Sequence, residues 1–206
     1  MRKKEQTIEL MKKAIEKDGE DYDLILVPKK MSRRVVGYGI MRYDLEKVIE
    51  YLEALRAETT EVTETALTYS SIALYGRCFT DSKDNFPKLD PSNIFDEDEK
   101  LYQSHTYFLD LRHKFIAHRR DTEHELGIAY IAVSKKNQTR ATMKYYQMKL
   151  AKFSEDDIQR FLHLVNYVHK KVLEKLEKNG NKLYDGMLNK YSFEELRKFQ
   201  INRFKD

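Results

Sequence analysis

The sequence contains a single cysteine, Cys78, in 206 residues. One thiol cannot form a disulfide within a chain, and so few cysteines are typical of proteins that work in the reducing cytoplasm. Structural zinc sites usually use several cysteine ligands. The cysteine content therefore argues against both a disulfide-stabilised secreted protein and a cysteine-based zinc protein.

Long apolar runs are also missing from the sequence. A helix needs about 20 mostly apolar residues to cross a bilayer, and no segment approaches that length. The basic start of the chain, Met1 to Glu5, is not followed by the apolar stretch of a secretory signal. We therefore expect a cytoplasmic protein that does not associate with membranes.

Charged residues, by contrast, are abundant, at 35% of the chain against 41% hydrophobic residues. Because the apolar residues still recur regularly, we expect solvated helix faces and not disorder. The net charge of +4 is modest, but basic residues gather at 29–34, 112–120 and 135–152. Such a distribution can steer an anionic ligand, although ordinary surface helices explain it equally well.

Helical periodicity is clearest from about Asp44 to Phe79. Apolar and small residues recur there at three- and four-residue steps: Leu45, Val48, Ile49, Leu52, Leu55, Val62, Ala66, Tyr69, Ala73 and Leu74. The pattern predicts one long amphipathic helix, or two helices with a break near Thr59 and Thr60. Arg77 continues the apolar stripe, and a charge at such a position is costly unless it is paired or solvated.

A second helix is predicted to begin near Asp96, after a polar loop at 80–97 that contains one helical turn after Asp90 and Pro91. Its apolar face carries two polar residues, His105 and Arg112. Two helices that each direct an arginine inward would form the walls of a polar site. The alternative is a pair of buried arginines satisfied by carboxylates or helix carbonyls.

Two further segments favour strands. Residues 22–27 and 35–40 are short and predict a small N-terminal β element. Residues 126–150 are rich in β-branched and aromatic residues on both sides of a polar turn at 134–138, which predicts a β-hairpin.

The rest of the chain is expected to be helical. Ser154 caps a helix that is predicted to end at Asn179 and Gly180, and a capping box at Ser192 and Glu195 begins a last helix to about Phe204. We thus expect an N-terminal extension at 1–43 and a mainly α domain at 44–206 into which the hairpin is inserted.

The segment from Asp110 to Asp121 holds the most informative pattern, because Arg112 and His118 lie six residues apart. At about 100° per residue, these side chains diverge by roughly 120° on an unbroken helix. They can border one pocket if the helix ends or bends near Ala117. They can also meet the same pair of a second subunit across a two-fold axis.

This pattern resembles the HEPN superfamily, which is marked by an arginine, a polar residue, a few further residues and a histidine. Arg112, His113 and His118 match, and the run RHKFIAHRRD is similar to the RNKxxAHxD form found in many bacterial members. The segment from Tyr75 to Asp81 resembles, more loosely, the RxFD helix of abortive-infection relatives. It departs from that motif because Thr80 stands between Phe79 and Asp81. The resemblance covers roughly 44–120 and the helix at 154–178.

The resemblance implies an up-and-down helical bundle that dimerises and cuts RNA without a metal or cofactor, as toxins and phage-defence proteins of this family do. His118 would be the general acid or base, because histidine titrates near neutral pH. Arg112 would hold the phosphate with its forked donor. His113 would position Arg112 or contact the phosphate, and Arg77 and His105 would support the site. The products would be a 2′,3′-cyclic phosphate and a 5′-OH end.

RNA contacts are predicted at four basic residues: Lys114, Arg119, Arg120 and Lys144. Arg119 and Arg120 are explained as well by simple solvation. Tyr145 and Tyr146 beside Lys144 would offer base stacking and charge, but packing within the hairpin would also account for them.

The histidines have structural alternatives. His118 could cap a helix C-terminus, His113 could be an exposed helix residue, and His105 could be a hydrogen-bonded core residue. The spacing of His113, His118 and His124 misses the i, i+4 pair of helical zinc motifs, so we expect no metal site.

Two other functions remain open on the sequence alone. The chain could be a HEPN module without catalysis, which binds RNA or nucleotides or pairs with an antitoxin or a nucleotidyltransferase. It could also be a helical scaffold in which Arg112 and His118 are structural.

Overall fold

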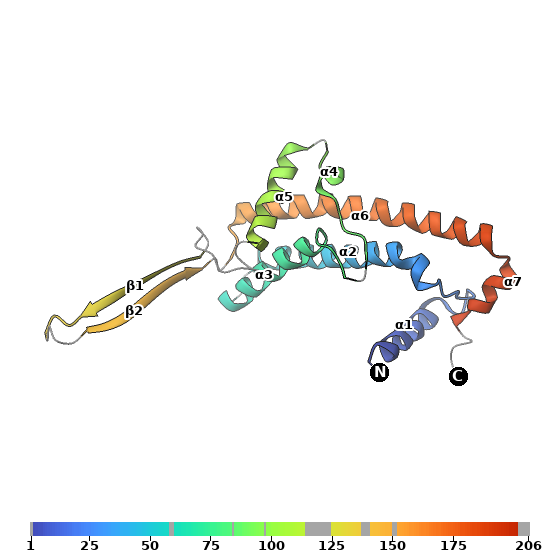
Figure 1. Ribbon diagram of the computed structural model, residues 1–206, viewed down its shortest axis with the longest axis horizontal. Helices are drawn as coiled ribbons and strands as arrows, with labels where there is room; N and C mark the ends of the chain where they lie inside the picture. Colours follow the sequence, from blue (N-terminus) through green and yellow to red (C-terminus); the bar gives the residue numbers. More distant parts are fainter. Residues whose placement is uncertain are drawn as a thin grey trace. The chain divides into compact units, whose positions relative to one another are not determined.

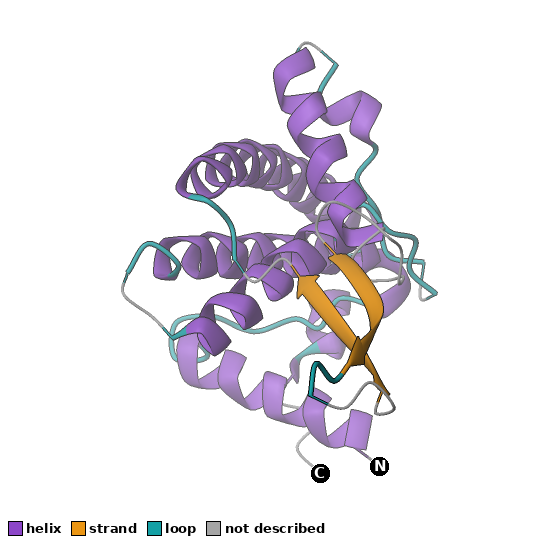
Figure 2. Cartoon of the chain, turned by 90° about the vertical axis from the view of Figure 1, so that its left-hand side faces the viewer, coloured by secondary structure: helices purple, strands orange, loops and turns teal. Residues whose placement is uncertain are grey.

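The computed structural model describes residues 2–57, 60–83, 85–96, 98–113, 125–136, 141–149 and 152–201. These residues form mainly helices together with one two-stranded antiparallel sheet (Figure 1, Figure 2). The prediction of a mainly α chain with a β-hairpin is therefore confirmed. The helices are α1 (Arg2–Asp18), α2 (Lys29–Ala54), α3 (Glu61–Arg77), α4 (Pro91–Ile94), α5 (Glu99–Leu111), α6 (Glu155–Lys190) and α7 (Phe193–Leu196). Among the described residues, no helix is both long and apolar enough to cross a membrane.

The chain divides into two compact units, Met1–Gly37 with Lys175–Asp206 and Tyr38–Glu174. Helices α2 and α6 each contribute residues to both units. The predicted boundary at residue 43 stays a prediction.

Local capping sets several helix ends. The Thr60 hydroxyl accepts a hydrogen bond from the backbone N–H of Thr63 at 3.3 Å, so α2 and α3 are two helices and not one. Asp98 caps α5 through the N–H of Leu101 at 2.9 Å. Asp90 caps the short helix α4 just before Pro91, and this confirms the predicted helical turn in that loop. Side-chain oxygens at these positions satisfy N–H groups that have no partner within the helix.

The predicted pairing of residues 22–27 with residues 35–40 in an N-terminal β element is wrong. Residues 35–40 lie inside α2, a 26-residue helix that continues on both sides of this short run, and an established helix propagates through residues with a weak strand preference. Residues 22–27 do include an extended segment, but it pairs with the end of the chain. Ile25 forms a β-bridge with Gln200, and the Leu26 N–H donates to the Phe199 carbonyl at 2.8 Å.

Two predicted boundaries near the C-terminus also differ. Helix α6 continues through Gly180 to Lys190, and the backbone of Gly180 does not adopt a positive φ angle. A glycine inside a helix costs only about 1 kcal/mol, so it does not end a helix that is extended on both sides. The capping box at Ser192 and Glu195 is confirmed, but α7 ends at Leu196 and a single 3-10 turn, Arg197–Phe199, follows it.

The unit Tyr38–Glu174 has one apolar core to which α2, α3, α5 and α6 all contribute. The rings of Phe108 and Phe161 stack with centroids 3.9 Å apart, and Tyr75 packs edge-on against Phe161 at 5.2 Å. Buried aliphatic residues complete the core, including Leu45, Val48, Leu52, Ile72, Leu164, Val165 and Val168. This packing fixes α3 and α5 side by side, and these are the helices that carry the predicted arginines.

The hairpin consists of β1 (Glu125–Val133) and β2 (Ala141–Lys149), so the prediction of a hairpin at about 126–150 is confirmed. The strands pair antiparallel, with Ile128 opposite Tyr146 and Tyr130 opposite Lys144.

Candidate functional site at the end of helix α5

Arg112 stands where the regular geometry of α5 ends. Its backbone N–H bonds to the carbonyls of Phe108 and Leu109, and Arg112 and His113 continue in a π-helical turn. Turns of this wide kind occur mostly singly and often at functional sites. The divergence of roughly 120° between Arg112 and His118 was calculated for a regular α-helix. Arg112 and His113 already depart from that geometry.

The side chain of Arg112 lies against Gly76 of α3. A Cβ atom added to Gly76 would stand 2.0 Å from Cδ and 2.8 Å from Nε of Arg112. Only a residue without a side chain leaves this space to the arginine stem. Gly76 is thus a positioning residue, one that the sequence analysis did not identify. The sequence feature that could have indicated this role is the presence of a glycine within a strongly helical stretch.

The charge of Arg112 has no acidic partner among the described residues. The side chain is half-buried, and none of the ion pairs within the described ranges includes it. The forked donors of a guanidinium match the oxygens of a phosphate or a carboxylate.

Arg77 differs from Arg112, although both were predicted to point inward. Its side chain is 57% exposed and turns back to Asp44 of α2, which is buried. Nε of Arg77 donates to Oδ2 of Asp44 at 2.8 Å, and the terminal nitrogen donates to Oδ1, which makes a two-pronged pair. Burial raises the pKa of Asp44 more than the guanidinium of Arg77 lowers it. Arg77 therefore fits the alternative prediction of an arginine that pairs with a carboxylate. Asp44 is the buried member of the pair, and its charge is the one that needs a partner.

His105 lies in the aromatic core and not on a surface. It is 2% exposed, and its Nδ1 lies 2.8 Å from the hydroxyl of Tyr75. The rings of Phe79 and Phe95 flank it with centroids at 4.3 and 4.9 Å. Burial lowers the pKa of His105 to about 4, so the imidazole is neutral at pH 7. Any support it gives to the site acts through the packing of α3 against α5.

Helix α5 is also tied to α6 by a contact that the sequence analysis missed. Nε of Arg160 donates to the Ser104 hydroxyl at 2.8 Å, and the guanidinium lies over the Tyr107 ring at 4.8 Å. The sequence signal for this contact was a small polar residue, Ser104, next to His105 in the predicted helix.

The remaining predicted site residues fall into two groups. His113 is exposed beside Arg112, and Lys144 is exposed on β2. Residues 114–124, which include Lys114, His118, Arg119 and Arg120, lie outside the described residues. Within the described ranges, no three His, Cys, Asp or Glu side chains are grouped so that they could hold a metal ion.

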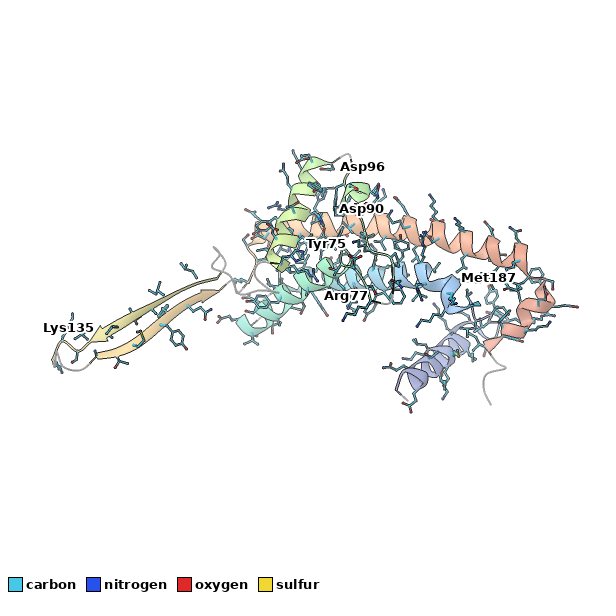
Figure 3. All side chains as sticks on the ribbon, viewed as in Figure 1. Tyr75, Arg77, Asp90, Asp96, Lys135 and Met187 are labelled. Carbon is cyan, nitrogen blue, oxygen red and sulfur yellow. The ribbon has the colours of Figure 1, made fainter. Side chains whose placement is uncertain are left out.

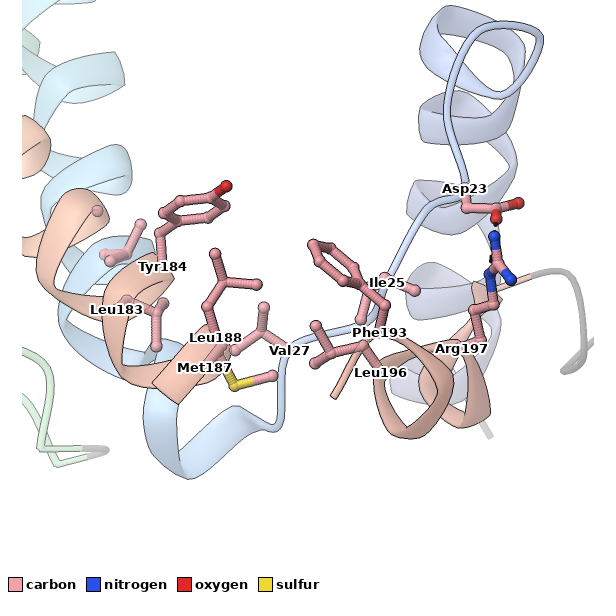
Figure 4. A pocket seen from close by; sticks show the side chains of 12 residues that line it. Asp23, Ile25, Val27, Leu183, Tyr184, Met187, Leu188, Phe193, Leu196 and Arg197 are labelled. Carbon is pink, nitrogen blue, oxygen red and sulfur yellow. Dashed lines mark ion pairs between the residues drawn. The ribbon is translucent and has the colours of Figure 1, made fainter. Parts of the chain in front are cut away.

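A separate hollow of about 500 Å³ lies within the unit formed by Met1–Gly37 and Lys175–Asp206 (Figure 4). Its walls are mostly apolar, with Ile25, Val27, Leu183 and Met187 among them, and Asp23 and Arg197 form an ion pair at 3.4 Å (Figure 4). None of the predicted site residues lines this hollow, so it is not the candidate site.

Comparison of the chain with protein-family models, with curated proteins and with solved structures finds no match.

Proposed function

We propose that the chain is a metal-independent endoribonuclease of the HEPN type, with toxin or phage-defence activity in the cytoplasm. Arg112 and His118 form its catalytic pair, two copies of the chain build the cleft, and the helical core is a HEPN-like bundle. The observation that carries this proposal is the placement of Arg112: the residue is half-buried against Gly76, it begins the motif, and its guanidinium has no acidic partner among the described residues.

The proposed chemistry needs only groups of the protein and of RNA. The 2′-OH of the RNA attacks the adjacent phosphorus while His118 accepts or donates a proton at an oxygen. Arg112 stabilises the negative charge that develops on the phosphate, and its stem packs against Gly76, which leaves room for it. Because Arg77 is bound to Asp44, we assign it the secondary role of holding α3 against α2 next to the site.

The test compares wild type with Arg112→Ala, Arg112→Lys and His118→Ala on labelled RNA in the presence of EDTA. We expect cleavage by wild type only, with losses of about 10²–10⁴-fold in the variants. Arg112→Lys should also be impaired, since lysine keeps the charge but lacks the fork. Arg42→Ala is the matched control, because Arg42 is an exposed arginine whose ion pair, with Glu46, lies one turn away on the same helix.

The outcomes separate the alternatives. Cleavage by Arg112→Ala at the wild-type rate would end the nuclease proposal. RNA binding by wild type that needs Arg112, without any cleavage, would assign the chain to the non-catalytic HEPN modules. Equal behaviour of all variants, with a large loss of stability in Arg112→Ala, would leave a helical scaffold.

A further inference from the structure

The hollow drawn in Figure 4, called the α6–α7 hollow from here on, has one wall that is fixed by pairing between distant segments. The Ile201 N–H donates to the Leu24 carbonyl at 2.8 Å. The Leu26 N–H donates to the Phe199 carbonyl, also at 2.8 Å. Ile25 lines the hollow and is held between these two hydrogen bonds. This wall is therefore set by the backbone of the protein itself.

Helices α6 and α7 supply further walls. The capping box at Ser192 sets the start of α7, and Phe193 in its first turn lines the hollow. Met187, near the C-terminal end of α6 (Figure 3), also lines it and is 5% exposed. Tyr184 and Phe193, by contrast, are 63% and 73% exposed. The hollow thus has a buried apolar base and an open aromatic rim.

A glycine leaves part of this space open. Gly180 lies within α6 and lines the hollow, and a Cβ atom added to it would meet nothing within 4 Å. Glycine is unfavourable inside a helix, yet here it is the residue type that adds no side chain to the wall. A hollow of about 500 Å³ with mostly apolar walls has the size and the character of pockets that bind small molecules.

We propose that the α6–α7 hollow binds an uncharged amphipathic small molecule, one with an aliphatic chain and a hydroxyl or carbonyl head. Its apolar walls match the chain. The charged residues among the twelve that line it are Asp23 and Arg197, and they pair with each other at 3.4 Å (Figure 4). The lining as a whole therefore carries no net charge. The proposal holds whether or not the chain cuts RNA.

The ion pair decides which head group fits. A carboxylate placed at Arg197 would lie beside Asp23, and an ammonium placed at Asp23 would lie beside Arg197, so either ion would meet a like charge. The Asp23 carboxylate is already bound a second time, because Nε2 of Gln200 donates to its Oδ1 at 2.7 Å. An uncharged oxygen avoids this conflict. It can accept a hydrogen bond from Arg197, since the ion pair runs through Nε and a guanidinium has further N–H groups.

A single tryptophan can report on binding, because the sequence contains none. Phe193→Trp places it on the exposed rim of the hollow, and octanol should shift its emission to the blue as the alkyl chain covers the indole. The affinity should rise about fourfold with each methylene from butanol to octanol. Octanoate and octylammonium should bind roughly tenfold or more weakly than octanol, because each would bring an unpaired charge into the hollow.

Gly180→Leu should fill the hollow from its wall and abolish the blue shift when it is combined with Phe193→Trp. Leucine favours helix more than glycine does, so the variant should fold, and urea unfolding checks this. Gly186→Leu is the matched control: Gly186 is exposed on the same helix, has free space around its Cβ position and does not line the hollow. It should leave binding unchanged, as should Arg112→Ala, which keeps this test separate from that of the nuclease.

Calorimetry of wild type with the same alcohols and ions does not depend on any variant. Failure of wild type to bind octanol would overturn the proposal. So would undiminished binding by folded Gly180→Leu, because the alcohol would then bind elsewhere on the chain. Tighter binding of octanoate than of octanol would assign the hollow to anions and overturn the uncharged class. An affinity that does not change with chain length would show that the apolar walls take no part.

Discussion

Acid should destabilise this protein through one buried imidazole, that of His105. Burial lowers its pKa from about 6.5 to about 4. Between these values the unfolded chain binds a proton that the folded chain does not, so the free energy of unfolding falls as the pH falls. With about 1.36 kcal/mol per pKa unit, the loss due to His105 is about 2 kcal/mol at pH 5 and about 3 kcal/mol at pH 4.

The double variant Tyr75→Phe/His105→Phe isolates this effect. It replaces a buried hydrogen-bonded pair with two apolar rings, next to Phe79 and Phe95. Such a replacement is close to neutral when both partners are changed together, so stability at pH 7 should stay within about 1 kcal/mol of wild type. The raised pKa of Asp44 acts in the opposite direction, because it lets the folded state bind a proton more readily. That effect is present in both proteins and cancels in the comparison.

Urea unfolding followed by circular dichroism, between pH 7.5 and 5, measures the difference. The variant should gain about 2 kcal/mol on wild type over this range, because it no longer has the titrating ring. The single variant Tyr75→Phe is the control: it should lose about 1–2 kcal/mol at pH 7, since it leaves the imidazole without its partner. A difference that does not change with pH would mean that His105 takes up its proton as readily in the folded chain as in the unfolded one. The assignment of His105 as a buried, neutral core residue would then be refuted.

Two substitutions on α3 should have contrasting effects. Gly76→Ala should lower RNA cleavage at least tenfold, because the added methyl displaces the stem of Arg112, while stability changes by no more than about 1 kcal/mol because alanine favours helix. Gly180→Ala, where a Cβ meets nothing, is its control and should leave cleavage unchanged; an active Gly76→Ala would show that the groove does not position Arg112. Arg77→Met should destabilise the fold by about 2 kcal/mol in urea unfolding, because buried Asp44 loses its partner. A loss below about 0.5 kcal/mol would show that Asp44 does not depend on this pair.

Local patterns in the sequence were sufficient for the features that depend on neighbouring residues. The three- and four-residue steps indicated α3 and α5, with Arg77 at the end of α3 and Arg112 directly after α5. The alternative of a break near Thr60 is confirmed, because Thr60 caps the start of α3. The hairpin followed from its β-branched and aromatic residues around a polar turn. Each of these depends on periodicity or on a capping side chain within a few positions, which a sequence shows directly.

The tertiary structure decided how the two predicted arginines are held. Asp44 pairs with Arg77 across 33 positions of sequence, whereas the side chain of Arg112 occupies space that a Cβ on Gly76 of another helix would fill. The helical state of residues 35–40 likewise did not follow from the local strand preference of that short run, which lies within the 26-residue helix α2. Contacts between residues that are distant in sequence depend on how the helices pack. The periodicity of apolar residues indicates which face of a helix is buried, but it does not indicate which other helix covers that face.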